Sequence, residues 1–273
     1  MRYIIDHDLH IHTSLSKCAN DPAQTPEAIL DYAEKNNFHT VCITDHFLDE
    51  DAKSPLADYE HPDIVPYAEH TFEYICRSLP LPESKNTRLL FGCEADMSFD
   101  EVIAISEKRK DFFDFMIVPI NHLHFIYLTR RPEDTSIESH VQRYYERFDA
   151  LLRSDMPFHK TGLAHIIDGL GTDASRYVEY LELFDDKILY NLFSRAATLG
   201  LNIEVNFNSL SDKEDILKKE VEFHRIALKA GCKFYLGSDA HTTAGLAMAR
   251  DRFEAAVDLI GLKESDKSPF VKK

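Results

Sequence analysis

The sequence lacks several patterns that would have placed it at once in a large class of proteins. It contains no uninterrupted run of about 18 apolar residues, so we expect no membrane span. The first residues, 1–6, have no apolar stretch leading to a small-residue cleavage site, which argues against a secretory signal. It also contains no P-loop, no GxGxxG and no GxSxG motif. Nucleotide-fuelled chemistry and serine hydrolysis therefore have no support.

Cysteines and basic residues are both scarce. The cysteines are odd in number, scattered and free of any CxxC pair, and they are Cys18, Cys42, Cys76, Cys93 and Cys232. This usage predicts reduced thiols and a cytoplasmic protein. The 31 Lys and Arg residues are outnumbered by 47 Asp and Glu residues, which gives a net charge of −16. Such a charge disfavours nucleic-acid binding, although a cleft of opposite local charge can still accept a small anion.

The chain also shows no internal repeat, no low-complexity segment and no long linker rich in Gly, Ser or Pro. With 44% hydrophobic and 29% charged residues, it has the composition of a soluble globular protein. Its 273 residues fit one large α/β domain, so we expect residues 1–273 to form a single domain.

Short apolar runs alternate with amphipathic stretches along the chain. Seven runs have strand character, at residues 3–10, 40–46, 88–97, 115–124, 161–167, 201–208 and 232–241. Helices are expected at residues 25–37, 99–113, 186–199 and 212–231, from apolar spacing, from Thr25 and Pro26 at one start, and from Gly200 and Gly231 at two ends. This alternation predicts βα units with a parallel sheet, and seven units favour a barrel.

Polar residues with metal-binding side chains recur at the ends of these runs. In chain order they are Asp8, His10 and His12; Asp45 and His46; Glu94 and Asp96; His122 and His124; His165; and Asp239 and His241. The carboxyl ends of parallel barrel strands meet on one face, so we expect these side chains to converge there. The spacing of His10 and His12 places both on one side of an extended strand, with His7 on the other side.

Neutral imidazoles and carboxylates are ligands for Zn²⁺, Mn²⁺ or Fe. Any single histidine in an apolar strand is more often a hydrogen-bonded core residue, but the recurrence at the same end of successive strands indicates a site. The number of ligands exceeds what one ion needs and predicts two or three ions, which would activate water and clamp a phosphate. The remaining histidines are expected to be surface or core residues: His39, His61, His70, His140, His159 and His224.

The segments DLHIHTSLS, ITDH, GCEADM, LAHIID and GSDAH, in this order, resemble the PHP (polymerase and histidinol phosphatase) family from residue 8 to about residue 245. The resemblance implies a distorted (β/α)7 barrel that carries two or three divalent ions. It also implies a metal-dependent phosphoesterase.

The resemblance further implies how the ligands divide among the ions. A first ion would be held by His10, His12, Glu94 and Asp239. Glu94 would bridge to a second ion, held also by His165 and by either His122 or His124, with His122 slightly preferred. His46 and His241 would belong to a third position, where three-metal members have a histidine and this chain has Cys18. A Cys18 thiolate as a zinc ligand and a vacant third position are both open.

The expected reaction is hydrolysis of a small phosphate monoester, as in histidinol phosphatases, by a metal-activated hydroxide. Asp239 and either His46 or His241, as proton donor to the leaving group, are the expected catalytic residues. Arg130, Arg131, Lys17 and Asn206 are the candidates for binding the substrate. The partner is expected to be a small phosphorylated metabolite, with sugar phosphates and nucleotides as further options.

Two other functions compete with this interpretation. An amidohydrolase that cleaves a C–N bond would also use an HxH pair, but it would need a metal-bridging lysine after a middle strand. Lys160 lies before the fifth strand run, and Glu94 takes the bridging role, so this option is disfavoured. A non-catalytic, metal-binding regulatory domain is disfavoured by the complete ligand set.

Overall fold

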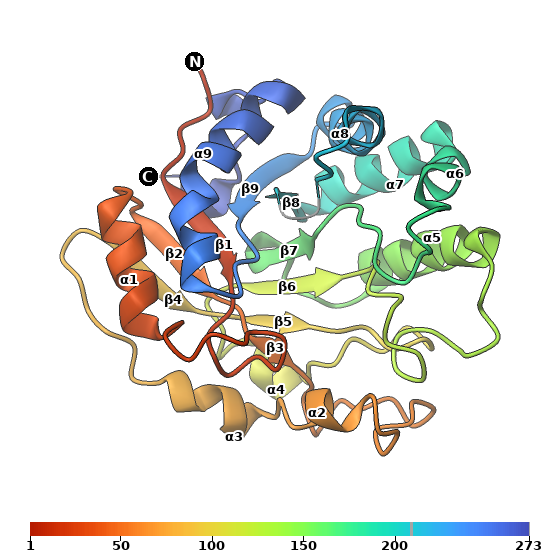
Figure 1. Cartoon of the computed structure of the whole chain (residues 1–273), viewed down its shortest axis with the longest axis horizontal. Coiled ribbons are helices and arrows are strands. Elements are labelled where there is room, and N and C mark those ends of the chain that lie inside the picture. The colour runs from red at the N-terminus through yellow and green to blue at the C-terminus, as the bar shows by residue number, and fades with distance from the viewer. Residues whose placement is uncertain (208–209, 273) are drawn as a thin grey trace.

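The computed structural model describes residues 1–207 and 210–272 (Figure 1). Strands and helices alternate through this part of the chain, and the paired strands run parallel. The strands are β1 (His7–Ile11), β2 (Thr40–Ile43), β3 (His46–Phe47), β4 (Arg88–Phe91), β5 (Cys93–Ala95), β6 (Met116–Pro119), β7 (Thr161–Ala164), β8 (Asn202–Asn206) and β9 (Lys233–Gly237). Each of the seven expected runs therefore contains a strand, and the runs at 40–46 and 88–97 each divide into two.

The helices lie around the outside of the strands in Figure 1. They are α1 (Pro26–Lys35), α2 (Val65–Ala68), α3 (Phe72–Ile75), α4 (Glu107–Lys110), α5 (Ile137–Arg153), α6 (Tyr177–Glu182), α7 (Asp186–Leu199), α8 (Glu214–Lys229) and α9 (Thr243–Ile260). Short 3₁₀ turns occupy Cys76–Ser78, Phe158–Lys160, Glu264–Asp266 and Pro269–Val271. Thr25 caps the start of α1 as predicted, because its side chain accepts a hydrogen bond from the Ala28 N–H. Gly200 caps the end of α7 as predicted, with φ 80°.

Two of the expected helices differ from the prediction. Residues 99–106 are not helical, and only α4 forms within 99–113. The apolar residues there pair with neighbouring segments instead: Ile103 bridges Met97, and the Ala104 carbonyl accepts from the Asp49 N–H. The helix expected at 212–231 forms as α8, but its N-cap is Lys213 without a side-chain cap.

The strands follow one another in the order of a barrel. Their ladders form two sheets, β1-β2-β4 and β3-β5-β6-β7-β8-β9, which are joined because β2 continues into β3 and β4 into β5. The last strand run returns to the first, where the Asp239 N–H donates to the His10 carbonyl at 2.7 Å and Ile11 bridges Ala240. This arrangement agrees with the (β/α)7 expectation and brings the carboxyl ends of the strands to one face.

Apolar side chains fill both the layer under the helices and the inside of the strand ring. The larger cluster joins strands to α1, α5, α7, α8 and α9. A smaller cluster takes its residues from the strands and the C-terminal turn, including Leu9, Ile117, Tyr235 and Val271. Cys42, Cys93 and Cys232 are buried, as expected of small core residues. Within residues 1–207 and 210–272, no helix combines the length and apolar character that a membrane crossing requires.

Candidate metal centre

The paired histidines of the first strand face each other across a very short gap. His10 and His12 are fully buried, and their Nε2 atoms lie 3.0 Å apart. His10 Nδ1 donates to Glu204 Oε1 at 2.7 Å. His12 Nδ1 donates to Ser16 Oγ at 3.0 Å, and Ser16 Oγ in turn donates to Asp45 at 2.7 Å. Both Nε2 atoms therefore point inward. Burial alone would lower the pKa of His10, but the charges of Glu204, Asp239 and Glu94 raise it, so without a cation its Nε2–H donates to His12 Nε2.

His122 and His165 repeat this design on the other side of the cluster. His122 Nδ1 donates to Asp96 Oδ1 at 2.9 Å, and His165 Nδ1 donates to Asn121 Oδ1 at 3.0 Å. Their Nε2 atoms both face Glu94 Oε1, at 3.7 and 3.1 Å. An acceptor that orients the outer nitrogen while the inner one points to a common centre is the usual surrounding of a metal-binding histidine.

Glu94 lies between the two pairs and presents a different oxygen to each. Its Oε1 faces His122 and His165, whereas its Oε2 lies 3.6 Å from His10 Nε2 and 3.4 Å from His12 Nε2. Asp239 Oδ1 lies 3.3 and 3.2 Å from the same two nitrogens. The carboxylate of Glu94 is therefore placed as a bridge between two ligand groups.

The pKa values of these groups favour cation binding. Burial lowers the pKa of His12 to about 4 and that of His122 to about 3, so both imidazoles are neutral at pH 7. For His165, burial is outweighed by the hydrogen bond to Glu94 and by its charge, which raise the pKa to about 9. A proton then occupies the space between His165 and Glu94, and a bound cation would displace it.

Two of the candidate ligands have unusual backbone conformations. His165, directly after β7, has φ 26°, and Asp239, shortly after β9, has φ 51°. Non-glycine residues with positive φ are uncommon, and such strain is concentrated at functional sites. This backbone conformation ends each strand and directs the side chain toward the cluster.

A further group of donors lies beside the first. His12, Cys18, His46 and His241 each offer a ligand atom, and these atoms lie within 4.8 Å of one another. His46 Nδ1 is buried without a hydrogen-bond partner and lies 3.1 Å from Glu94 Oε2. Burial, together with Glu94 and Asp239, raises the pKa of the Cys18 thiol, so the sulfur is protonated when no cation is bound.

These donor sets fit divalent metal ions. Among the described residues, the donors of this site form four overlapping groups: His10, His12 and Glu94; His10, His165 and Asp239; Glu94, His122 and His165; and the group that contains Cys18. Without a cation, the buried His46 Nδ1 has no hydrogen-bond partner, which is costly. His, Cys and carboxylate donors suit Zn²⁺, Fe²⁺ or Mn²⁺.

A cavity of about 210 Å³ opens over this cluster. Its described lining consists of the candidate ligands Cys18, His46, Glu94, His122, His165, Asp239 and His241, together with Tyr67, His124, Phe125 and Leu170. The strand run expected at 115–124 is shorter than predicted, because β6 ends at Pro119 and both His122 and His124 lie in the following loop. His122 reaches Glu94, whereas the His124 ring packs on Phe125 with centroids 3.9 Å apart.

The structure does not bring the predicted basic residues to this cavity. Arg130 Nη1 bonds to His140 Nε2 and the Asp134 carbonyl, and Arg131 lies over the Phe99 ring. Lys17 forms an ion pair with Glu69 at 2.9 Å. The side chains of Arg130, Arg131 and Lys17 therefore contact partners outside the cavity.

Asn206 does reach the cluster, where its Nδ2 donates to Asp239 Oδ2 at 3.2 Å. It therefore lies behind a candidate ligand. Lys160, the lysine considered for the bridging role of an amidohydrolase, donates to the carbonyls of Lys110 and Phe113, and the described lining of the cavity includes no lysine.

Several residues that orient the candidate ligands had no role assigned from the sequence, although Asp96 was expected on the same face. Glu204 holds His10 and also accepts from the His165 N–H, Asn121 and Asp96 hold the second pair, and buried His70 accepts from the Lys17 N–H. In the sequence, Glu204 could have been identified as an acid within an apolar strand run. Asp96 could have been identified by its place two residues after Glu94. His7 is outside the cluster, as expected, because its Nε2 accepts from the Leu236 N–H.

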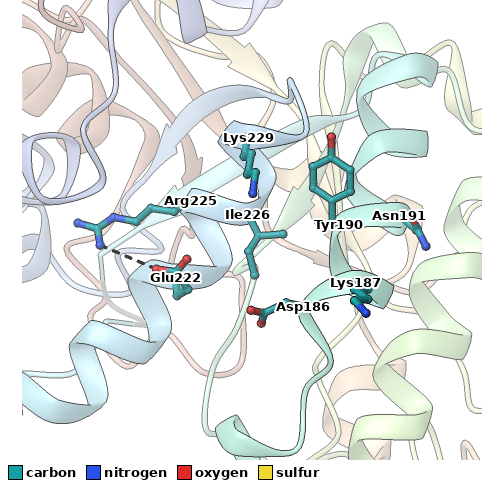
Figure 2. A pocket seen from close by; sticks show the side chains of 8 residues that line it. All are labelled: Asp186, Lys187, Tyr190, Asn191, Glu222, Arg225, Ile226 and Lys229. Atoms are coloured by element: carbon teal, nitrogen blue, oxygen red, sulfur yellow. Dashed lines mark ion pairs between the residues drawn. The ribbon is translucent and has the colours of Figure 1, made fainter.

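A larger groove, of about 490 Å³, lies between α7 and α8 (Figure 2). Tyr190 and Ile226 form its apolar part, and charged side chains such as Lys187 and Glu222 surround them. Its described lining includes no histidine, no cysteine and none of the clustered ligands. The larger groove therefore lacks the candidate metal ligands, which line the smaller cavity.

A parallel α/β barrel with clustered histidines and carboxylates at its strand ends defines a class of metal-binding proteins. A family model described as the PHP domain matches residues 8–195. The chain belongs to this family.

Among solved structures, the chain is similar to histidinol phosphate phosphatase from Lactococcus lactis subsp. lactis Il1403, in a complex with zinc, L-histidinol and phosphate. The TM-score is 0.54 at 14% identity, over 92% of this chain and 93% of that one. Weaker similarities include ochratoxinase from A. niger (TM-score 0.41, 11% identity, 97% and 68% covered). Another is a putative alpha-L-fucosidase from Bacteroides thetaiotaomicron VPI-5482 (TM-score 0.40, 12% identity, 93% and 96% covered). A search of curated protein sequences found no match.

Proposed function

We propose that this protein is a metal-dependent phosphoesterase that hydrolyses a small phosphate monoester. One observation carries the proposal: four buried imidazoles have Nδ1 tethered outward and Nε2 directed at the Glu94 and Asp239 carboxylates. These are His10, His12, His122 and His165. Membership of the PHP family and the fold shared with a histidinol phosphate phosphatase support it.

In this proposal His10, His12, Glu94 and Asp239 would hold one divalent ion, and Glu94, His122 and His165 a second. The ions would supply an activated hydroxide and neutralise the charge of the phosphate. Cys18, His46 and His241 would hold a third. Where that position is empty, His46 or His241 would carry the proton to the leaving oxygen.

The surrounding residues orient these ligands and exclude water from their outer sides. Glu204, Ser16, Asp96 and Asn121 each accept a hydrogen bond from one imidazole, which fixes its tautomer. Because the cavity is small, at about 210 Å³, it favours a compact ester over a nucleotide. Zinc, iron or manganese would serve, and the substrate would be a small phosphorylated metabolite of the kind that histidinol phosphate represents.

The test is the release of inorganic phosphate from L-histidinol phosphate, a sugar phosphate and a nucleoside monophosphate, with added Mn²⁺ or Zn²⁺ and with chelator. We expect release from at least one ester, its loss in chelator, and a decrease of more than about a hundredfold in Asp239→Asn. Asp63→Asn is the matched control, because that carboxylate is 83% exposed. Bound metal without release from any ester would contradict the proposal.

A further inference from the structure

The cavity contains very few groups that could hold a phosphate besides the candidate metal ligands. The remaining described lining residues are Tyr67, His124, Phe125 and Leu170, and none of the described lining residues is Lys or Arg. A phosphoryl group bound to metal ions still presents oxygens to the protein, and these need hydrogen-bond donors. Arg130, Arg131 and Lys17 are held elsewhere, so the donor has to come from the lining itself.

Tyr67 has the properties of such a donor. It lies in the short helix α2, in a segment that gave no functional signal in the sequence. Its ring packs edge-on against Phe125 at 4.4 Å and against His46 at 6.2 Å, measured between centroids. Those contacts fix the direction of the phenol, and a fixed donor loses little entropy when it binds a ligand.

The Tyr67 hydroxyl is also free to bind. Tyr67 lines the cavity, and no hydrogen bond to its hydroxyl occurs among residues 1–207 and 210–272. His124, the other polar candidate, has its Nδ1 buried away from solvent without a partner. A phenol hydroxyl is protonated at neutral pH, so it can donate a hydrogen bond.

We propose that the Tyr67 hydroxyl donates a hydrogen bond to a non-bridging phosphoryl oxygen of the substrate. This inference rests on the proposed function and adds a specific substrate-binding residue to it. The same contact would form with inorganic phosphate, which retains the non-bridging oxygens but lacks the leaving group.

The test compares wild type with Tyr67→Phe, which keeps the ring and its contacts. Tyr127→Phe is the matched control, because Tyr127 belongs to the same apolar cluster as Tyr67 but does not line this cavity. Three quantities are measured: kcat/KM for the best ester, the inhibition constant of inorganic phosphate, and the number of metal ions bound. In Tyr67→Phe we expect kcat/KM to fall, and the inhibition constant to rise, by about ten- to a hundredfold, because a hydrogen bond to a charged group is lost. Metal content and melting temperature should not change, and Tyr127→Phe should stay within about twofold of wild type.

An unchanged inhibition constant for phosphate in Tyr67→Phe would overturn the inference, even if kcat/KM fell, because the contact would then lie on the leaving group. If wild type released phosphate from no ester, the proposed function would fail separately. In that event, calorimetric binding of inorganic phosphate to the metal-loaded proteins decides the inference. Weaker phosphate binding by Tyr67→Phe than by wild type supports the inference. Equal binding by the two proteins, or no binding by wild type, refutes it.

Discussion

Arg147 joins the segments after β5 and β6, which carry Asp96 and His122, and its removal should be among the most damaging single changes in the protein. It lies in α5 and is 1% exposed. Its guanidinium donates five hydrogen bonds to backbone carbonyls, which belong to Met97, Ser98, Pro119, Ile120 and Thr129. Met97 and Ser98 directly follow Asp96, whereas Pro119 ends β6 and Ile120 lies two residues before His122. Burial lowers the pKa of Arg147 to about 10, so the group is still charged at pH 7.

In Arg147→Met all five carbonyls lose a charged donor inside the protein. Each buried acceptor left unsatisfied costs about 1 kcal/mol or more, and part of this is offset because no charge is buried any longer. We therefore expect the free energy of unfolding to fall by about 3–5 kcal/mol. Arg147→Lys, with three donors on a flexible chain, should lose about 2 kcal/mol.

The assay is urea unfolding of the chelated protein at pH 7, followed by circular dichroism. Arg153→Met is the control on the same helix, because Arg153 is 60% exposed and pairs with Asp149, so its loss should cost less than about 1 kcal/mol. If Arg147→Met were no more destabilising than Arg153→Met, the five hydrogen bonds would not have the assigned role.

Three further changes have definite expectations. In Gly237→Ala the new Cβ would lie 1.8 Å from Glu204 Oε1, so we expect the free energy of unfolding to fall by about 2–3 kcal/mol and metal binding to weaken. Gly245→Ala is the control and should be neutral, because its nearest neighbour atom would lie 3.5 Å from the new Cβ. Equal melting temperatures of the two variants would disprove the clash. Burial lowers the pKa of His7 below 6.5 despite its bond to Asp6, so its neutral form stabilises the fold above about pH 6.5 and this stability is lost as the pH falls. His7→Gln should therefore flatten the decrease in stability between about pH 6.5 and 5, and an unchanged slope in urea titrations would contradict this. Replacing Cys18 by Ser should lower the number of zinc ions retained after dialysis, and full retention would show that the sulfur is not a ligand.

The sequence was sufficient to predict the barrel order of the strands and the convergence of most candidate ligands for a simple geometric reason. Parallel strands place their carboxyl ends on one face, so polar residues at the ends of apolar runs must converge whatever the loops do. His10, Glu94, His165 and Asp239 are fixed to strands or lie directly after them, and their positions follow from strand order. The residues that accept hydrogen bonds from the outer Nδ1 atoms of the histidines were harder to predict. The pairing of each acceptor with its imidazole depends on strand register.

Features set by loop conformation could not be derived in this way. Arg130 directly follows a loop that carries ligands, but its guanidinium turns toward His140, and no local pattern gives that direction. Tyr67 approaches the cavity from a distant segment because its ring packs on Phe125, a contact between residues far apart in the chain. The helix expected at 99–113 forms only in part, because the backbone of Ile103 pairs with Met97 and the Ala104 carbonyl accepts from the Asp49 N–H. These contacts outweigh the helix propensity of the segment.

Whether Glu94 bridges two metal ions that hydrolyse a phosphate ester is decided by two measurements on wild type and Glu94→Gln: the metal ions bound per chain and the phosphate released. The two Glu94 oxygens face different histidine pairs. We therefore expect at least two ions in wild type, fewer in Glu94→Gln, and turnover reduced by more than about a hundredfold. Equal metal content and equal turnover in the two proteins, or phosphate release by wild type that persists in chelator, would contradict this expectation.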